Sequence, residues 1–302
     1  MRNEIQKGYQ KGLLGIVIMS TVPVTIKWVS ADPWVIGIAR LVIATLVMSF
    51  MFPLMSELRG LRGKDYLSLV SLGICFGLHW MTYFFSIKLG SATIAVIATI
   101  SFYGIFLSLA GSYFLAHRIR WFHWIALSLG VIGTVLVADA FDFGTGALAG
   151  FMIGILSGTF YGALPILHQK ASHLSHTLRS WAQFAGALPI FLCFAGLGSW
   201  NLPQTDWIGL LYLALFGTLV AHTLWVHAVS ELPTTASSLI KYLYIPLTAI
   251  ISYFVLGESL NAQQLVGAVI IVCGSLLGLM GDQLLQRRAS TQESSISVQS
   301  GS

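Results

Sequence analysis

Three basic residues fall inside long apolar stretches of the sequence: Lys27, Arg40 and Lys241. No Asp or Glu falls in the interior of any of these stretches. A cation at the centre of a bilayer costs roughly 2.5–3.5 kcal/mol even on the lenient insertion scale, so such residues are usually functional. Because no buried acid is available to pair with them, we expect the missing negative charge to arrive with a ligand.

Lys241 has the most distinctive sequence surroundings of the three. It is flanked by Tyr242 and Tyr244 and followed by Pro246, and a proline frees a backbone carbonyl one turn earlier and tends to kink a helix. In a membrane such a break is tolerated where neighbours or water satisfy the freed group. We therefore expect this segment to face a ligand. The alternatives are an ion pair with Glu231 and a side chain that extends to the membrane surface.

Arg40 lies about six residues into its apolar stretch, roughly 9 Å deep at ~1.5 Å per residue. Its guanidinium can bind a carboxylate or phosphate through two parallel hydrogen bonds. It can equally satisfy carbonyl groups at a helix end or reach the outer interface. Lys27 lies nearer to the end of its stretch, and we interpret it as an interfacial residue.

Two histidines, His79 and His222, occupy matching positions in the two halves of the chain. An offset of 143 residues pairs them and also pairs Lys88 with Glu231. We predict that both histidines face a central cavity, where they donate hydrogen bonds to a substrate or relay a proton near neutral pH. The alternative is that each one hydrogen-bonds a neighbouring backbone group.

Aromatic residues near the middle of the apolar stretches complete the candidate site. Tyr and Trp at span ends usually form interfacial belts, whereas central ones need a partner for their polar group. The predicted substrate-binding residues are Arg40, His79, Trp80, Tyr83, Tyr103, Tyr161, His222, Trp225, Lys241, Tyr242 and Tyr244, with His79 and His222 also the candidates for proton coupling.

The composition of the 302-residue chain indicates a membrane protein. Hydrophobic residues make up 56% of it and charged residues only 9%, against about 25% charged residues in an average soluble domain. Ten apolar stretches of about 18–24 residues match the roughly 20 helical residues that cross a ~30 Å hydrocarbon core. The predicted spans are residues 12–30, 34–54, 66–88, 92–115, 121–139, 146–168, 180–199, 207–229, 235–257 and 262–281.

The positive charges are unequally distributed over the predicted loops. If the N-terminus is cytoplasmic, 12 of the 16 Lys and Arg residues fall in cytoplasmic segments and Lys88 alone falls in an outer loop. This positive-inside bias predicts that both termini are cytoplasmic. Because the basic residues are spread over loops on one side, the net charge of +5 is not interpreted as a nucleic-acid-binding signal.

The two halves of the chain resemble each other. Residues 112–117 (SYFLAH) recur as residues 252–258 (SYFVLGE), one residue longer. Each half holds five predicted spans, and because five is odd the halves insert with opposite topology, as in many secondary transporters. We place the repeats at residues 1–140 and 141–282. The remaining residues, 283–302, are rich in Gln, Arg and Ser and are predicted to form a disordered cytoplasmic tail.

One segment of the second half resembles a known family. Residues 246–258 (PLTAIISYFVLGE), followed by Gln263 or Gln264 and Gly267, are similar to the ninth helix, the Leu-Gly-Glu turn and the tenth helix of the EamA-type proteins of the drug/metabolite transporter superfamily. The first half departs from the family pattern with Leu-Ala-His at residues 115–117. The resemblance implies a helical basket in which helices 1–4 and 6–9 surround a central cavity, with helices 5 and 10 peripheral.

These features predict a multi-pass secondary active transporter of the bacterial cytoplasmic (inner) membrane that works by alternating access. The expected substrate is a small anionic or zwitterionic metabolite such as an amino acid or carboxylate, because the buried cations lack an acidic partner. The family resemblance favours an exporter or exchanger over an uptake system. The alternatives are a multidrug exporter and a membrane-embedded lipid-modifying enzyme.

The sequence shows no signature of an enzyme or of a bound cofactor. It has no carboxylate pair at membrane depth and no Gly-rich phosphate loop with a lysine. His168, His173 and His176 are interpreted as residues of a solvated loop, with a metal site as the alternative. The expected partners are the small-molecule substrate and the lipid bilayer. Gly274-x-x-x-Gly278 allows close helix packing, either within a monomer or in a homodimer.

Overall fold

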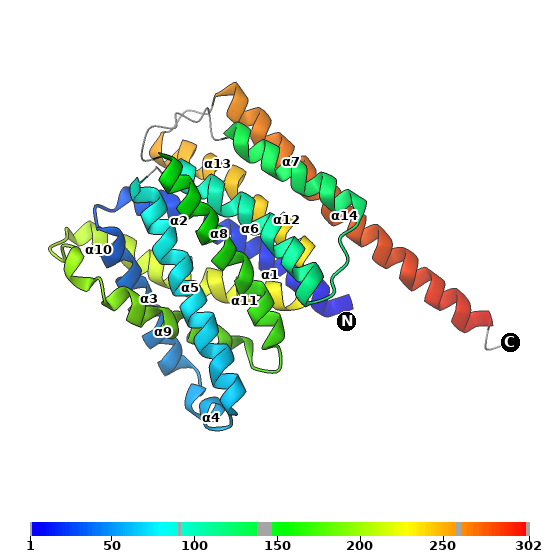
Figure 1. Ribbon diagram of the computed structural model, residues 1–302, viewed down its shortest axis with the longest axis horizontal. Coiled ribbons are helices and arrows are strands. Elements are labelled where there is room, and N and C mark those ends of the chain that lie inside the picture. Colours follow the sequence, from blue (N-terminus) through cyan, green and yellow to red (C-terminus); the bar gives the residue numbers. More distant parts are fainter. Residues whose placement is uncertain (1, 90–91, 138–146, 258–260, 300–302) are drawn as a thin grey trace.

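The protein is a bundle of helices (Figure 1), described by a computed structural model at residues 2–89, 92–137, 147–257 and 261–299. Within these ranges no β-strand occurs. The helices of the first half are α1 (Arg2–Ser20), α2 (Val22–Trp28), α3 (Pro33–Met51), α4 (Leu54–Arg59), α5 (Gly63–Leu89), α6 (Ala92–Phe114) and α7 (Trp121–Val137). The second half contains α8 (Ala147–Lys170), α9 (His176–Leu192), the 3-10 turn η1 (Ala195–Leu197), α10 (Gln204–Ala214), the π-helical segment η2 (Leu215–Val220), α11 (Ala221–Glu231), α12 (Thr234–Tyr242), α13 (Tyr244–Leu256) and α14 (Ala262–Gln299).

Several helices are long and apolar enough to cross a membrane. Six such stretches occur in the described residues: Glu4–Trp28, Pro33–Met51, Gly63–Ser86, Leu148–Lys170, Gln204–Glu231 and Thr234–Leu256. Three shorter apolar helices are Ala98–Phe114, Trp121–Leu136 and Leu265–Gly281. The predicted span 180–199 corresponds to α9, which is only 17 residues long and carries Arg179 and Gln183. The protein is therefore a multi-pass membrane protein.

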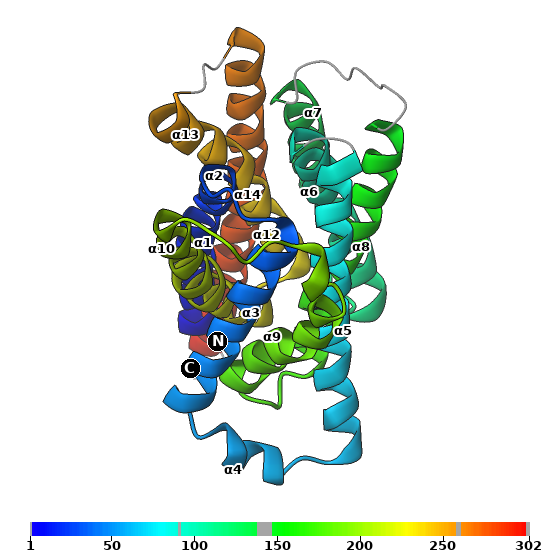
Figure 2. The same ribbon diagram turned by 90° about the vertical axis from the view of Figure 1, so that its left-hand side faces the viewer.

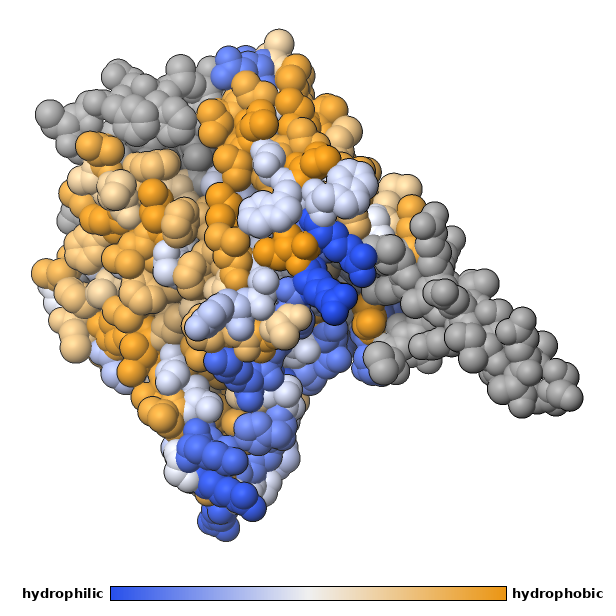
Figure 3. Space-filling model, turned by 45° about the vertical axis from the view of Figure 1, so that its right-hand side comes forward, coloured by the Kyte–Doolittle hydropathy of each residue, from blue (hydrophilic) through white to orange (hydrophobic). Residues whose placement is uncertain are grey.

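The surface of the bundle is apolar over most of its height. Figure 3 shows hydrophobic residues over much of one face and hydrophilic residues gathered toward its lower end. Large hydrophobic side chains such as Phe50, Tyr113 and Phe254 are among the most exposed. A soluble protein rarely exposes an apolar surface of this extent, whereas a lipid-facing surface must.

Helices of one half pack mainly against helices of the other half. The helices α1, α3, α5, α6 and α7 of the first half can be matched in order with α8, α9, α10–α11, α12–α13 and α14 of the second. With this matching, several contacts between the halves recur when each helix is replaced by its counterpart. The packing of α5 on α8 corresponds to that of α11 on α1, and the packing of α5 on α9 corresponds to that of α10 on α3. The pairs α3–α9, α6–α12 and α7–α14 each join a helix to its own counterpart. This arrangement fits the expected two-repeat organisation, with α7 and α14 side by side at the edge (Figure 1).

The turn before the last helix of each half has the same unusual backbone. Ala116 and Gly257, which align in the two repeats, both adopt positive φ angles, of 54° and 67°. This left-handed conformation suits glycine and is unfavourable for alanine. Glu258, which follows in the family-like motif, lies outside the described residues, as does the predicted junction of the repeats near residues 140–146.

In three of the matched helix pairs, within the described part of the chain, one helix is interrupted and its counterpart in the other repeat is continuous. α1 and α2 are separated at Thr21, α12 and α13 at Leu243, and η2 separates α10 from α11. The Ser20 hydroxyl donates to the Tyr244 carbonyl at 3.5 Å, and the Thr248 hydroxyl donates to the Ser20 carbonyl at 3.2 Å, so the end of α1 lies against the start of α13. The matching helices α8, α6 and α5 run without interruption.

The C-terminal segment differs from the sequence-based expectation. Residues 283–299, predicted to be disordered, continue α14 to Gln299 and extend away from the bundle (Figure 1). The reason is that this helix is already nucleated by its apolar part, and extending a formed helix is far easier than starting one. Leu, Gln, Arg and Ala in the first turns of the segment are also good helix formers.

Candidate functional site

Lys241 lies at the centre of the candidate site, at the end of α12 and only 2% exposed. Its Nζ donates a hydrogen bond to the Tyr161 hydroxyl of α8 at 2.6 Å and lies 3.2 Å from the Met19 sulfur of α1. Of the alternatives considered from the sequence, neither is present. The side chain is buried, and Glu231 contacts His176 instead, at 3.5 Å.

Three aromatic rings surround the ammonium group. Its Nζ lies 4.6 Å from the ring centroid of Tyr161, 4.9 Å from that of Trp225 and 5.3 Å from that of Tyr244. Rings within about 6 Å of a cation attract it through their quadrupole. The lysine is therefore held by neutral, electron-rich groups from α1, α8, α11 and α13.

Two further polar groups of the cluster make no hydrogen bond of normal length and angle among the described residues, although they lie close to each other. They are the hydroxyl of Tyr103 on α6 and the indole Nε1 of Trp225 on α11, and both side chains are buried. Tyr103 packs against Tyr161 with ring centroids 4.8 Å apart. A buried polar group without a partner is costly, so each such group needs an explanation. Together with Lys241 they bring three hydrogen-bond donors to one place.

His79 on α5 belongs to the same cluster. Its ring stacks on Tyr161 with centroids 4.1 Å apart and an interplanar angle of 10°. Its Nδ1 lies 2.9 Å from the Ser157 hydroxyl and 3.2 Å from the Ser157 carbonyl, and the Ser157 hydroxyl donates to the His79 carbonyl. The imidazole therefore holds the Tyr161 ring in place, and its backbone contact is the alternative that the sequence left open.

His222 on α11 is buried beside His79 but has different contacts. Its ring meets Phe76, Trp80 and Phe184 edge-on, with centroid distances of 5.1, 6.0 and 6.2 Å. Phe76 also lies 6.3 Å from His79. The two histidines predicted to be symmetry mates thus share one aromatic neighbour. Their predicted part in proton coupling stays a prediction.

Arg40 on α3 is held by the π-helical segment. Its Nε donates to the Thr218 hydroxyl at 2.8 Å, and its Nη2 donates to the Gly217 carbonyl at 3.4 Å. Its guanidinium lies over the Trp80 ring at 4.2 Å. A π-helical turn misaligns carbonyls with their usual N–H partners, and Arg40 satisfies one of them. These contacts match the alternative in which Arg40 serves backbone carbonyls.

The remaining predicted residues divide into two groups. The ring centroid of Tyr83 lies 6.1 Å from that of His79, so Tyr83 belongs to the central cluster. Tyr242 does not, because its hydroxyl donates to the Ser101 carbonyl at 3.1 Å and its ring fills a gap between Gly104 and Gly130. Successive residues on a helix point about 100° apart, so neighbours on α12 cannot both face the centre.

Two members of the cluster were not predicted from the sequence. Met19 and Ser157 are an ordinary hydrophobic residue and a small polar one, and nothing in their spacing separates them from other core positions. Met19 is the last residue but one of α1, two residues before the break at Thr21.

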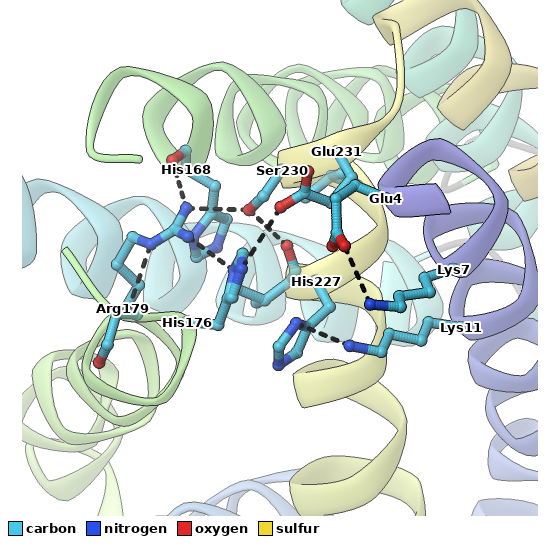
Figure 4. A network of polar contacts seen from close by, with 12 residues as sticks. Glu4, Lys7, Lys11, His168, His176, Arg179, His227, Ser230 and Glu231 are labelled. Atoms are coloured by element: carbon cyan, nitrogen blue, oxygen red, sulfur yellow. Dashed lines mark hydrogen bonds and ion pairs between the residues drawn. The ribbon is translucent and has the colours of Figure 1, made fainter. Parts of the chain in front are cut away.

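A second cluster of polar residues lies where α1 begins and α11 ends (Figure 4). This terminal network consists of Lys11, His168, His176, Arg179, His227, Ser230 and Glu231. Arg179 of α9, only 1% exposed, binds the His168 carbonyl, the Ser230 hydroxyl at 2.9 Å and His176 Nδ1 at 2.7 Å. His176 also contacts Glu231. The buried guanidinium therefore joins α8, α9 and α11.

The terminal network extends to α1 through a pair of stacked histidines. The rings of His176 and His227 have centroids 3.9 Å apart, and Lys11 Nζ of α1 lies 3.1 Å from His227 Nδ1. Partial burial, His227 and Arg179 together lower the pKa of His176 to about 4. His176 is therefore neutral at pH 7, which lets its Nδ1 accept from Arg179.

The three loop histidines considered as a metal site each contact a different side chain. His168 Nε2 lies 2.8 Å from Gln183 Oε1, and His173 Nε2 lies 2.9 Å from Asp65 Oδ1. His176 belongs to the terminal network. The described residues contain no group of three or more His, Cys, Asp or Glu side chains arranged to hold a metal ion.

Comparison with known families gives a match over both halves. The sequence model of the EamA-like transporter family matches residues 6–138 and again residues 148–280.

Named relatives are transporters from bacteria and archaea. An uncharacterized transporter of Archaeoglobus fulgidus is 24% identical over 88% of this chain and 93% of its own length. A probable amino-acid metabolite efflux pump of Salmonella typhimurium is 25% identical over 70% of this chain and 75% of its own. An S-adenosylmethionine uptake transporter of Rickettsia bellii is 27% identical over 67% of each chain.

A solved crystal structure has the same fold. It superposes with a TM-score of 0.76 at 16% sequence identity and covers 94% of this chain and 99% of the other. At this identity the likeness concerns the fold alone.

Proposed function

Because this chain belongs to the EamA-like transporter family, we propose that it is a secondary active transporter of a small anionic or zwitterionic metabolite. An amino acid or a related carboxylate is the kind of substrate intended. The protein moves it by alternating access, as an exporter or exchanger, in the bacterial inner membrane. Ten spans with both termini in the cytoplasm, and a monomer or homodimer, complete the proposal.

One observation carries the choice of substrate. Lys241 Nζ, the Tyr103 hydroxyl and Trp225 Nε1 are three buried donors in one cluster, and the described ion pairs bring no carboxylate to them. Lys241 has only the Tyr161 hydroxyl as an oxygen acceptor, and donors with unused hydrogen-bonding capacity in one cluster favour a ligand that supplies a further acceptor. A carboxylate or phosphate oxygen supplies this acceptor together with a negative charge to pair with the Lys241 ammonium.

The arrangement of charges supports the proposed orientation. His173 and Thr234 lie within three residues of His176 and Glu231 in the chain, so the same end of the bundle also holds the contact of His173 with Asp65 and that of His117 with Thr234. The loops at that end carry most of the basic residues, including Arg118, Arg120 and Lys170. Positive loops mark the cytoplasmic side of a membrane protein.

The names of two relatives agree with a substrate of this class. One is named for amino-acid metabolites and the other for S-adenosylmethionine, a molecule that carries a carboxylate and cationic groups. One name specifies efflux and the other uptake, so we base the direction of transport on the family resemblance alone.

Transport by purified protein in liposomes tests the proposal. Exchange of radiolabelled amino acids, carboxylates and phosphorylated metabolites identifies a substrate, and Lys241→Gln is then compared with Lys7→Gln. Lys7 is exposed and pairs only with Glu4 among the contacts described for it, at 2.9 Å. We expect Lys241→Gln to raise the apparent KM at least tenfold and the control to leave it unchanged. An unchanged KM in Lys241→Gln contradicts the proposed anion contact.

A further inference from the structure

The groups around the Lys241 ammonium are those that bind an organic cation. They are the Tyr161 hydroxyl oxygen at 2.6 Å, the Met19 sulfur at 3.2 Å and the rings of Trp225 and Tyr244. All four are neutral and electron-rich, and desolvated aromatic rings of this kind also recognise ammonium groups of ligands. No carboxylate is among the contacts that the described residues make with this lysine.

We propose that Met19, Tyr161, Trp225 and Tyr244 form a cation subsite for an ammonium or sulfonium group of the substrate. Lys241 occupies this subsite in the empty protein as a tethered substitute for that group. The inference rests on the proposed function and narrows it, because the substrate then carries a cation as well as an anion.

The displaced lysine has a second set of neighbours that prepares it for the anion. The Tyr103 hydroxyl and Trp225 Nε1 lie close to each other in the same cluster, and neither makes a hydrogen bond of normal length and angle within the described structure. A lysine side chain is a flexible four-carbon stem that carries three donors. When the substrate cation enters the subsite, Lys241 turns with these two donors toward the substrate's anionic oxygen.

Arg40 shows why Lys241, and not every buried cation, is exchangeable. The Arg40 guanidinium also lies against an aromatic ring, that of Trp80, at 4.2 Å. Its N–H groups, however, are bound to Thr218 and to the Gly217 carbonyl of η2. Removing Arg40 from its place would leave a backbone carbonyl without a donor. Lys241 leaves behind a hydroxyl, a thioether and rings, which a substrate cation satisfies equally well.

Binding of tetramethylammonium to purified protein tests the subsite directly. In Lys241→Met the lysine no longer competes, so we expect this variant to bind radiolabelled tetramethylammonium at least tenfold more tightly than the matched control Lys7→Met. An affinity in Lys241→Met no higher than in the control overturns the inference.

A pair of isosteric carboxylates gives a second test that keeps Lys241 in place. Glycine betaine and 3,3-dimethylbutanoate differ in a quaternary nitrogen against a quaternary carbon. We expect the unmodified protein to bind betaine at least tenfold more tightly, and we expect Tyr244→Leu to reduce this ratio at least threefold. The inference is overturned if the protein binds the two compounds equally tightly, or if it binds neither of them.

The two proposals fail in different ways. If Lys241→Gln impairs carboxylate transport but Lys241→Met gains no affinity for tetramethylammonium, only the cation subsite is wrong. If Lys241→Gln leaves the KM for every anionic substrate unchanged, the proposed function is wrong.

Discussion

The central cluster around Lys241 and the terminal network around Arg179 both bury a cation, but they satisfy it differently. Arg179 has a carbonyl, a hydroxyl and an imidazole as acceptors, with Glu231 one contact further away. Lys241 has one hydroxyl, a thioether sulfur and aromatic rings. Arg179 therefore has several oxygen and nitrogen acceptors from three helices, whereas Lys241 has one oxygen acceptor and otherwise contacts sulfur and aromatic rings.

Replacing each cation by methionine should produce the largest difference between the two regions. Arg179→Met leaves the His168 carbonyl and Ser230 without their charged donor, so we expect the free energy of unfolding to fall by about 2–3 kcal/mol. Lys241→Met removes a buried charge that has no acidic partner, and we expect a change below about 1 kcal/mol or a gain.

Thermal unfolding of the purified variants in one detergent measures this difference. Lys7→Met, at an exposed position, is the control for loss of a positive charge. Equal loss of stability in Arg179→Met and Lys241→Met would show that the two clusters do not differ as described.

Arg40 sharpens the comparison because it lies near the central cluster but is bound like Arg179. We expect Arg40→Met to lower the free energy of unfolding by about 1–2 kcal/mol, since it removes charged hydrogen bonds to Thr218 and Gly217. Thr218→Val should reproduce about 1 kcal/mol of this loss. Thr159→Val, whose hydroxyl binds only the Ile155 carbonyl of its own helix among the contacts described, is the control. If Arg40→Met loses substrate affinity but keeps its full stability, Arg40 contacts the substrate and the structural interpretation is wrong.

The pH dependence of stability distinguishes the terminal network in another way. The folded pKa of His176, about 4, lies below the unfolded value of about 6.5. Between these values the unfolded chain binds more protons, so stability is highest above pH 6.5 and decreases as the pH falls toward 4. His176→Gln should flatten this part of the profile measured by thermal unfolding. Solvent exposure of His176 makes the effect modest, and an identical profile in the variant would contradict it.

The smallest effect on stability is expected at Tyr103. Its buried hydroxyl has no hydrogen-bond partner among the described residues, so Tyr103→Phe should leave the melting temperature unchanged or slightly raised. Tyr161→Phe, in contrast, removes the acceptor of Lys241 and should lower stability by about 1 kcal/mol. Tyr103→Phe should nevertheless weaken transport of an anionic substrate, and normal transport by this variant would remove Tyr103 from the site.

Much of the fold could be predicted because its signals are local. The length and polarity of each apolar stretch reflect the thickness of the bilayer, so most predicted spans begin and end within several residues of a helix or a broken helix pair, the exceptions being the start of α1 and the end of α14. The repeated SYF segment located equivalent turns, and both have positive φ angles at the aligned residue. The span at α9 was harder to recognise in the structure, because Arg179 and Gln183 make it less apolar than its neighbours.

The candidate site could be predicted only in part. Hydrophobic context identified Lys241, His79 and Tyr161 as unusual residues. It did not reveal that Tyr242 turns toward Ser101, because the orientation of a side chain depends on how its helix is rotated in the bundle. Nor did it reveal Met19, since a methionine in an apolar span has no distinguishing feature.

By itself, then, the sequence determined that this is a multi-pass protein of two similar halves, and that its central spans contain basic residues without acidic ones. These are properties of composition and spacing, which need no knowledge of contacts. Only the tertiary structure distinguished Arg40, whose N–H groups bind Thr218 and the Gly217 carbonyl, from Lys241, which contacts a hydroxyl, a thioether sulfur and aromatic rings. The acceptors that make this difference come from η2, α1, α8 and α11, segments far apart in the chain, and a hydrogen bond exists only where folding brings its two atoms within about 3 Å of each other.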